Sequence, residues 1–237
     1  MQIKTDNEQI TCTEADIYNS ILNLDNSHIL DLGCGAGHYT YDIALGGENR
    51  VVLGLEVDEI QHQKNIENEL PDNLTFGVGG AQNIPADDNS FDVVMMFKSL
   101  HHVPLGLMGV AMGEVHRVLK PGGFAYISEP VFDGNFNEVL KIFHNEERVR
   151  AAAFEAVKSS VEVNDFTSLN QVFFNTYGHY INFDEFQKYV VEKTYLDNPL
   201  SGDLIEKTRA KFEEYMEDDG AHFLSPNRVD VLQKNQT

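Results

Sequence analysis

The stretch ILDLGCGAGHYT, at positions 29–40, contains the residues best suited to binding a ligand. Gly33, Gly35 and Gly37 alternate there with Cys34 and Ala36, directly after a short apolar run. Because glycine has no Cβ, such a segment can turn sharply and let a ligand approach the backbone closely. The stretch therefore predicts a ligand-binding turn, with a purely structural glycine turn as the alternative.

The glycine spacing narrows the class of ligand. A dinucleotide-binding turn needs glycines at its first, third and sixth positions, but His38 stands at the sixth position and the last glycine comes one residue early. A Walker A loop needs a Gly-Lys-Ser/Thr sequence, which does not follow here. We therefore expect a nucleoside ligand without a phosphate cradle, and the NAD-dependent oxidoreductases become a less favoured alternative.

Glu56 ends the next β-type run of the sequence, VVLGLE. A carboxylate in that place can accept hydrogen bonds from both ribose hydroxyls, and a hydrogen bond to a charged group contributes about 1.5–3 kcal/mol. Asp58 is the rival acid, and we interpret it as a solvated loop residue.

These residues need a framework to position them, and the first 130 residues alternate β-type runs with helix-type segments. This alternation predicts a Rossmann-like α/β fold with a doubly wound, mostly parallel sheet, whose ligands bind at the carboxyl ends of the strands. The expected strands cover residues 28–32, 51–57, 74–78, 91–97 and 124–128, and the expected helices cover residues 39–45, 59–69 and 105–119.

The following segment has a different character. Residues 131–223 are rich in aromatic side chains and are expected to be mostly helix and loop, with helices over 137–160, after Asn182 and over 203–219. Residues 228–233 return to strand-like alternation and are expected to close the sheet edge. The sequence thus predicts one domain over 1–237, in which 131–220 form a helical cap that selects the substrate.

Composition sets further limits on function. The 237 residues include 38 Asp and Glu against 17 Lys and Arg, which gives a formal charge of −21. Such a charge disfavours nucleic acids and anionic membranes as partners. The sequence contains no apolar run long enough to cross a bilayer and no zinc-like Cys/His spacing, and its first residues lack the apolar core of a signal peptide. We therefore expect a cytoplasmic protein without a bound metal.

Four stretches taken together resemble the class I S-adenosylmethionine-dependent methyltransferases of the small-molecule type. They are ILDLGCGAGHYT at 29–40, VVLGLEVD at 51–58, NIPADDNSFDVVMMFKSLHHV at 83–103 and VHRVLKPGGFAYISEP at 115–130. The resemblance implies S-adenosylmethionine as cofactor, a small-molecule methyl acceptor and in-line methyl transfer. The cofactor-binding residues that it implies are Asp31, Gly33, Cys34, Gly35, Gly37, Glu56, Val57, Ala81, Gln82 and Phe97.

The resemblance assigns a role to each part of this set. Asp31 would hold the cofactor's amino group, Val57 would pack against adenine, and Phe97 would border the methionine portion. Many family members have an aspartate where this chain has Gly80, and that aspartate binds the adenine amino group. Here Ala81 or Gln82, or water, must take its place.

No catalytic residue is identified from the sequence. Lys98, His101 and Glu129 are candidates for a general base, should the acceptor need to lose a proton. We expect a structural role for His102, and we expect His144, Tyr177 and His179 to be packed or solvated. A non-catalytic protein that binds S-adenosylmethionine is a second alternative. A methyltransferase acting on nucleic acid or protein is a third, disfavoured because the chain reads Phe97-Lys98-Ser99-Leu100 where amino-methylating enzymes carry Asn-Pro or Asp-Pro.

Overall fold

In the described part of the chain, nine strands pair into one sheet. The computed structural model describes residues 1–192 and 200–235. The strands are β1 (Ile10–Thr11), β2 (His28–Leu32), β3 (Val51–Glu56), β4 (Leu74–Val78), β5 (Phe91–Phe97), β6 (Leu119–Pro130), β7 (Phe166–Tyr180), β8 (Met216–Glu217) and β9 (Gly220–Lys234).

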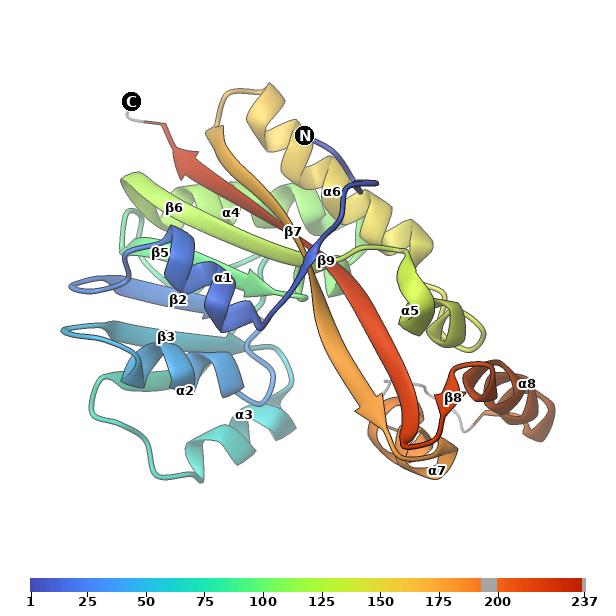
Figure 1. Cartoon of the computed structure of the whole chain (residues 1–237). Coiled ribbons are helices and arrows are strands. Elements are labelled where there is room, and N and C mark those ends of the chain that lie inside the picture. Colours follow the sequence, from blue (N-terminus) through green and yellow to red (C-terminus); the bar gives the residue numbers. More distant parts are fainter. Residues whose placement is uncertain (193–199, 236–237) are drawn as a thin grey trace.

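Helices connect and cover these strands (Figure 1). The α-helices are α1 (Glu14–Ile21), α2 (His38–Leu45), α3 (Glu59–Ile66), α4 (Met108–Val118), α5 (Gly134–Leu140), α6 (Glu147–Glu162), α7 (Phe183–Phe186) and α8 (Gly202–Glu213). Shorter turns are the 3₁₀-helices η1 (Leu100–His102) and η2 (Leu105–Leu107) and the π-helical η3 (Gln187–Val191).

The sheet follows the order β1-β7-β9-β6-β5-β2-β3-β4, and β8 pairs with β9 outside this path. From β6 to β4 neighbouring strands are parallel, whereas β9 runs antiparallel to both β6 and β7. The strand order reverses between β5 and β2. After β2 the chain adds β3 and β4 on one side of β2, and it then adds β5 and β6 on the other side. In open α/β sheets, ligands bind at this switch point.

Alternation along the central strands divides the core into two layers. In β5, Val94 and Met96 pack with α4 and α6 on one face of the sheet, whereas Val93 and Met95 pack with α1 and α2 on the other. Successive side chains of a strand point to opposite faces, so a strand buried on both faces must be apolar throughout. The run FDVVMMF fulfils this requirement, as the sequence predicted.

The central part of the predicted fold is confirmed. All five expected strands and all three expected helices of the first 130 residues are present, with ends that differ by a few residues except at β6, which begins five residues before its expected start. The predicted helix cap at Asn182 is also present, since its side chain accepts a hydrogen bond from the backbone amide of Glu185.

The prediction for residues 131–223 was wrong in part. Helices occur there, but β7 is a strand of fifteen residues that pairs with β9 along its whole length. The register of this pair shifts between Ser168 and Asn170, and such a shift interrupts the alternation from which a strand is predicted.

Two helices and one strand in this region also differ from the prediction. The expected helix 137–160 is two helices, α5 and α6, and the expected helix 203–219 ends at Glu213, before the short strand β8. The expected edge strand 228–233 belongs to β9, which lies inside the sheet between β6 and β7. The edge on this side is β1.

Beyond the main sheet, β7 and β9 continue as a two-stranded arm toward α7 and α8 (Figure 1). The arm has an aromatic core of its own, in which Phe183, Phe186, Phe212 and Phe223 pack together. In the described part of the chain, no helix is both long and apolar enough to cross a bilayer.

Candidate functional site

The glycine turn after β2 faces open space at one position. Gly33, Gly35 and Gly37 all have positive φ, of +77°, +54° and +75°. A Cβ on Gly33 would lie 2.7 Å from Ser99 Cβ, and one on Gly37 would lie 2.6 Å from Phe76 Cζ. A Cβ on Gly35 would meet no described atom within 4 Å. The turn therefore packs closely on two sides and leaves its middle glycine accessible to a ligand.

Glu56, at the end of β3, is hydrogen-bonded to this turn. Its carboxylate accepts hydrogen bonds from the backbone amides of Gly35 at 2.8 Å, Val57 at 2.8 Å and Asp58 at 3.0 Å. The buried Asn65 side chain donates to Gly35 O at 2.7 Å, which fixes the turn from below. A carboxylate offers about four acceptor positions, so Glu56 keeps acceptor capacity for a ligand beside Gly35.

Asp58, the rival acid, has a structural role. Its carboxylate accepts the backbone amides of Ile60 and Gln61 and so caps α3. This capping role leaves Glu56 as the acid that faces the turn.

Asp31 lies beneath the turn and is 1% exposed. The Thr40 hydroxyl donates to its Oδ2 at 2.7 Å, and its Oδ1 has no hydrogen-bond partner among the described residues. Burial raises the pKa of Asp31 to about 7, and the hydrogen bond from Thr40 offsets only part of this effect. A buried carboxylate with one free oxygen is suited to a cationic partner.

Three apolar side chains at the ends of β3 and β4 and the start of α3 are exposed. Val57 is 62% exposed, Ile60 is 70% exposed and Val78, which pairs with Glu56 in register, is 45% exposed. A flat apolar ligand ring lying there would cover surface that is now in contact with water.

Ala81, Gln82 and Phe97, which are also expected to bind the cofactor, differ in their exposure and packing. Ala81 is 6% exposed and packs in the core, so it can offer a ligand mainly its backbone. The Gln82 amide folds over Gly80, where a Cβ would come within 2.8 Å of its Oε1. Gln82 thus occupies the space of the missing aspartate side chain. Phe97 is 8% exposed, and its ring centroid lies 4.5 Å from that of Tyr39.

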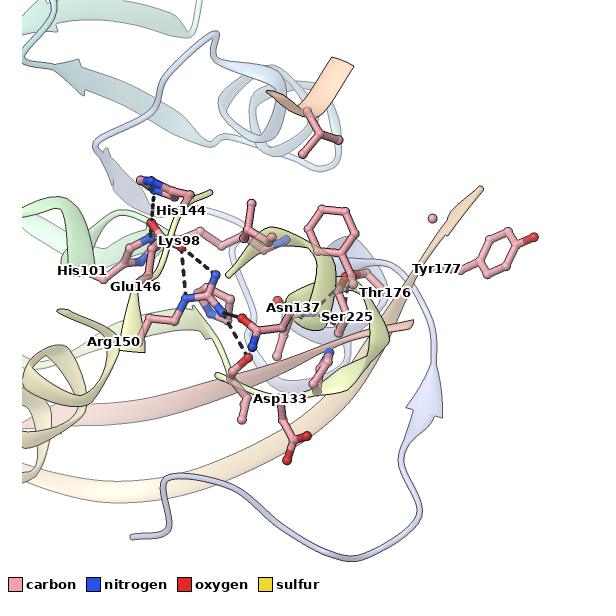
Figure 2. Close-up of a pocket in the computed structure, with 18 of the residues that line it drawn as sticks. Lys98, His101, Asp133, Asn137, His144, Glu146, Arg150, Thr176, Tyr177 and Ser225 are labelled. Carbon is pink, nitrogen blue, oxygen red and sulfur yellow. Dashed lines mark hydrogen bonds and ion pairs between the residues drawn. The ribbon is translucent and has the colours of Figure 1, made fainter. Parts of the chain in front are cut away.

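A cavity of about 620 Å³ opens next to the end of β5, between the main sheet and the arm (Figure 2). Lys98 lines it, and the following residue, Ser99, packs against Gly33 of the turn. Residues 98–99 therefore lie at the border between the cavity and the glycine turn. The other lining residues that matter below are His101, Asn137, His144, Glu146, Arg150 and Tyr177.

A buried His101 stands between two carboxylates in the wall of this cavity. His101 Nδ1 lies 2.6 Å from Glu129 Oε2, and its Nε2 lies 3.5 Å from Glu146 Oε1. Burial alone would lower the pKa of His101, but the two negative charges outweigh burial and raise the pKa to about 9. At neutral pH the ring is therefore a cation and cannot accept a proton.

Glu146 joins this histidine to a buried arginine. Arg150 Nη2 donates to Glu146 Oε2 at 2.7 Å, and Arg150 Nη1 donates to Asn137 Oδ1 at 3.2 Å (Figure 2). His144 Nε2 lies 2.9 Å from Glu146 Oε1. Burial would raise the pKa of Glu146, but His101 and Arg150 lower it well below its ordinary value. The cavity wall is thus a fixed network of alternating charges.

The raised pKa of His101 predicts a pH dependence of stability. Its interactions with Glu129 and Glu146 contribute fully below pH 6.5, the ordinary histidine pKa, and are lost as the pH rises through about 9. The difference in unfolding free energy between wild type and His101→Gln should therefore shrink from pH 6.5 to pH 9.5. Urea unfolding measures this difference, and histidine NMR should give a midpoint near pH 9.

His28→Gln is the matched control, because His28 is exposed in β2. It should leave the pH profile of the wild type unchanged. A His101 that titrates near its ordinary pKa of about 6.5 would contradict the ion pairs described here.

Lys98 differs from the other two candidate bases. It has a left-handed backbone with φ of 55°, held by a 2.7 Å hydrogen bond from its amide to Ser128 O. Desolvation lowers the pKa of its amine, and the side chain lines the cavity. Glu129 is 1% exposed and is engaged by His101 and by the Leu100 amide. Of the three candidates, Lys98 is the one suited to accept a proton from a molecule in the cavity.

The structure thus brings the glycine turn, Glu56 and Asp31 together, and it places Lys98 and His101 in the neighbouring cavity. The sequence prediction missed Glu146 and Arg150. The sequence does carry a signal for these two residues. Glu146 and Arg150 are four residues apart, which is the spacing of an ion pair on a helix. Arg150 also precedes Ala153 and Phe154 at helical spacing, on the buried face of α6.

Comparisons with known proteins relate the chain to methyltransferases. A family model described as a methyltransferase domain matches residues 23–185. The demethylmenaquinone methyltransferase of Lactiplantibacillus plantarum is 32% identical over 135 residues, which cover 50% of this chain and 55% of that protein. The sterol 4-C-methyltransferase of Caenorhabditis elegans is 32% identical over 129 residues, which cover 52% of this chain and 38% of that protein. The chain therefore spans about half or less of the length of these relatives.

Among solved structures, the YcgJ protein from Bacillus subtilis superposes with a TM-score of 0.67 at 17% identity. The superposition covers 94% of this chain and 97% of that protein. At this identity the similarity concerns the fold, and it extends over the arm as well as the main sheet.

Proposed function

Because the chain belongs to the family of methyltransferase domains, we propose that it transfers a methyl group from S-adenosylmethionine to a small-molecule acceptor. The observation that carries this proposal is the hydrogen bond from Gly35 to Glu56 beside a cavity. It joins the glycine turn and the acid into one site, and the acceptor would occupy the cavity.

The residues present fit this cofactor. Glu56 would accept a ribose hydroxyl in its remaining acceptor position, and Asp31 Oδ1, which has no partner among the described residues, would take up the amino group, directly or through water. The open space at Gly35 would admit the ligand, and the exposed Val57 would cover one face of adenine. The Gln82 amide, folded over Gly80, would contact the adenine amino group.

S-adenosylmethionine supplies a methyl group activated by a positively charged sulfur. The chain's own contribution is to hold the acceptor close and aligned, which can supply up to about 7–11 kcal/mol in well-oriented systems. Ser99, packed against Gly33, and Lys98, which lines the cavity, mark the border at which the two ligands would meet.

The cavity supports an acceptor of small-molecule size, because pockets of roughly 300–1,000 Å³ are typical for such ligands. Its wall carries fixed charges and an amine with a lowered pKa, which favour an acceptor with an ionisable hydroxyl or similar group. Lys98 would take the proton from that group, and the cationic His101 would stabilise the anion formed.

Calorimetry with S-adenosylmethionine and with its demethylated product, S-adenosylhomocysteine, tests cofactor binding. Absence of binding by both in the range of about tens of micromolar would overturn the proposal. Binding without turnover across a broad screen of phenols, hydroxy acids and amines would instead favour a non-catalytic protein that senses the cofactor.

Asp31 gives this proposal a pH signature. Its pKa of about 7 in the free protein means that at lower pH the carboxyl must lose a proton before it can pair with the cofactor's ammonium group. The affinity should therefore rise about tenfold from pH 5.5 to pH 6.5 and level off above pH 7.

Calorimetry in two buffers of different ionisation enthalpy should detect proton release at pH 6 and little at pH 8. Asp31→Asn should weaken binding and remove this dependence. A wild-type affinity that is constant from pH 5.5 to pH 7 would exclude Asp31 as the partner of the ammonium group.

A further inference from the structure

Outside the cavity, a second group of polar side chains converges on the arm. His179 of β7 and His222 of β9 are directly opposite each other in register, and their ring centroids lie 4.8 Å apart. Asp219, in the turn between β8 and β9, lies next to both rings. The strand pairing therefore fixes two imidazoles and one carboxylate at one place.

The rings present the same nitrogen to this place. His222 Nε2 lies 2.8 Å from Asp219 Oδ1, and His179 Nε2 lies 2.9 Å from the backbone oxygen of Asp219. One ligand atom from each of the three side chains lies within 4.8 Å of the others. Two imidazole nitrogens and a carboxylate oxygen are a common donor set for late divalent transition metals, and water can complete the coordination.

The hydrogen bond at the second ring nitrogen of His222 also suits a metal-binding histidine. Its Nδ1 is hydrogen-bonded to the Tyr177 hydroxyl. Because a hydroxyl can both donate and accept, Tyr177 can accept from Nδ1–H once Nε2 holds a metal. Such a hydrogen bond from the second ring nitrogen orients most metal-binding histidines.

The charge around Asp219 favours a cation. Within the described part of the chain, the one ion pair of Asp219 is with His222, and Glu217 and Asp218 directly precede it. By contrast, the group of His101, His102 and Glu146 in the cavity could also be close enough to hold an ion, but Arg150 binds Glu146 at 2.7 Å. A dication there would meet the guanidinium charge, so the cavity group is the poorer site.

From this arrangement we propose that His179, His222 and Asp219 form a binding site for a divalent transition metal, with Zn²⁺ as the best match. The site links β7, β9 and the turn after β8. Tyr177 lines the cavity and is hydrogen-bonded to His222. A metal bound to His222 would therefore also hold Tyr177 in place in the cavity wall.

Zn²⁺ titration of the full, chelator-treated chain tests the proposal by calorimetry and by the thermal unfolding temperature. One equivalent of Zn²⁺ should bind and raise the unfolding temperature, whereas Mg²⁺, which prefers oxygen ligands, should do neither. His179→Ala and His222→Ala should each weaken binding by on the order of 100-fold or more, and Tyr177→Phe by about 10- to 100-fold.

His102→Ala is the matched control, because it removes an exposed histidine from the cavity group and leaves the arm unchanged. It should bind Zn²⁺ as the wild type does. The proposal is wrong if the wild type does not bind Zn²⁺, if His179→Ala and His222→Ala both keep wild-type affinity, or if His102→Ala alone loses it. These readouts do not depend on methyl transfer, so the metal site and the proposed function can fail separately.

Discussion

Glu56→Ala is expected to weaken the binding of S-adenosylmethionine by about 10- to 150-fold. This factor corresponds to about 1.5–3 kcal/mol, the contribution of hydrogen bonds to a charged acceptor. The substitution removes the carboxylate that would hold the ribose and also the acceptor of the Gly35 amide, so the turn itself loses a hydrogen bond. Calorimetry at neutral pH measures the change.

Two companion variants separate ligand binding from local structure. Glu56→Gln keeps one acceptor oxygen for the Gly35 amide but loses the charge, and it should bind the cofactor with intermediate affinity. Asp58→Ala removes the cap of α3, which should cost about 0.5–2 kcal/mol of stability and leave the affinity near that of the wild type. Wild-type affinity in Glu56→Ala would show that another group holds the ribose.

Arg150→Met is expected to destabilise the fold by about 3–5 kcal/mol. Arg150 and Glu146 form a buried ion pair at 2.7 Å, and both side chains are 9% exposed. Removing Arg150 leaves the buried charge of Glu146 with the histidines His101 and His144 as its cationic neighbours among the described residues, and losing one partner of a buried ion pair is the costly case. The free energy of unfolding in urea is the measurement.

Lys158→Met on the same helix is the matched control. Lys158 pairs with Glu155 and Glu162 at 3.8 and 3.7 Å on the exposed face of α6, where ion pairs contribute about 0–1 kcal/mol. The double variant Arg150→Met/Glu146→Gln should recover part of the loss, because it removes the orphaned charge. If Arg150→Met costs no more than Lys158→Met, the network in the cavity wall does not stabilise the fold.

The glycine turn, the acid beside it and the central strand could be predicted because their signals are local in the sequence. The glycine turn directly follows β2, Glu56 ends β3, and the apolar run of β5 can only be a central strand. Each of these features is set by neighbouring residues, so periodicity and spacing were sufficient to locate them.

The cavity half could not be predicted in the same way, because it depends on contacts between distant segments. The charge network needs the end of β6 to meet the start of α6, since Glu129 and Glu146 contact opposite sides of the same imidazole ring. His179 and His222 become neighbours through the register of β7 and β9, and the shift after Ser168 concealed β7 itself. The sequence therefore predicts no more for His179 than a packed or solvated side chain.

The long strands of the arm have a consequence for how such a protein can change its substrate. A strand of fifteen residues spans about 50 Å, but β6 accompanies β9 only along residues 227–233. Apart from the short pairing of β8 with Gly220 and Ala221, the remainder of β9 forms a ribbon of two strands with β7. A narrow ribbon bends more readily than a broad sheet, and it carries Tyr177 in the cavity wall but none of the residues around the glycine turn. If the proposed function is correct, mutations in the ribbon would reshape the acceptor chamber and leave the donor-binding residues intact, so substrate choice could evolve separately from methyl supply.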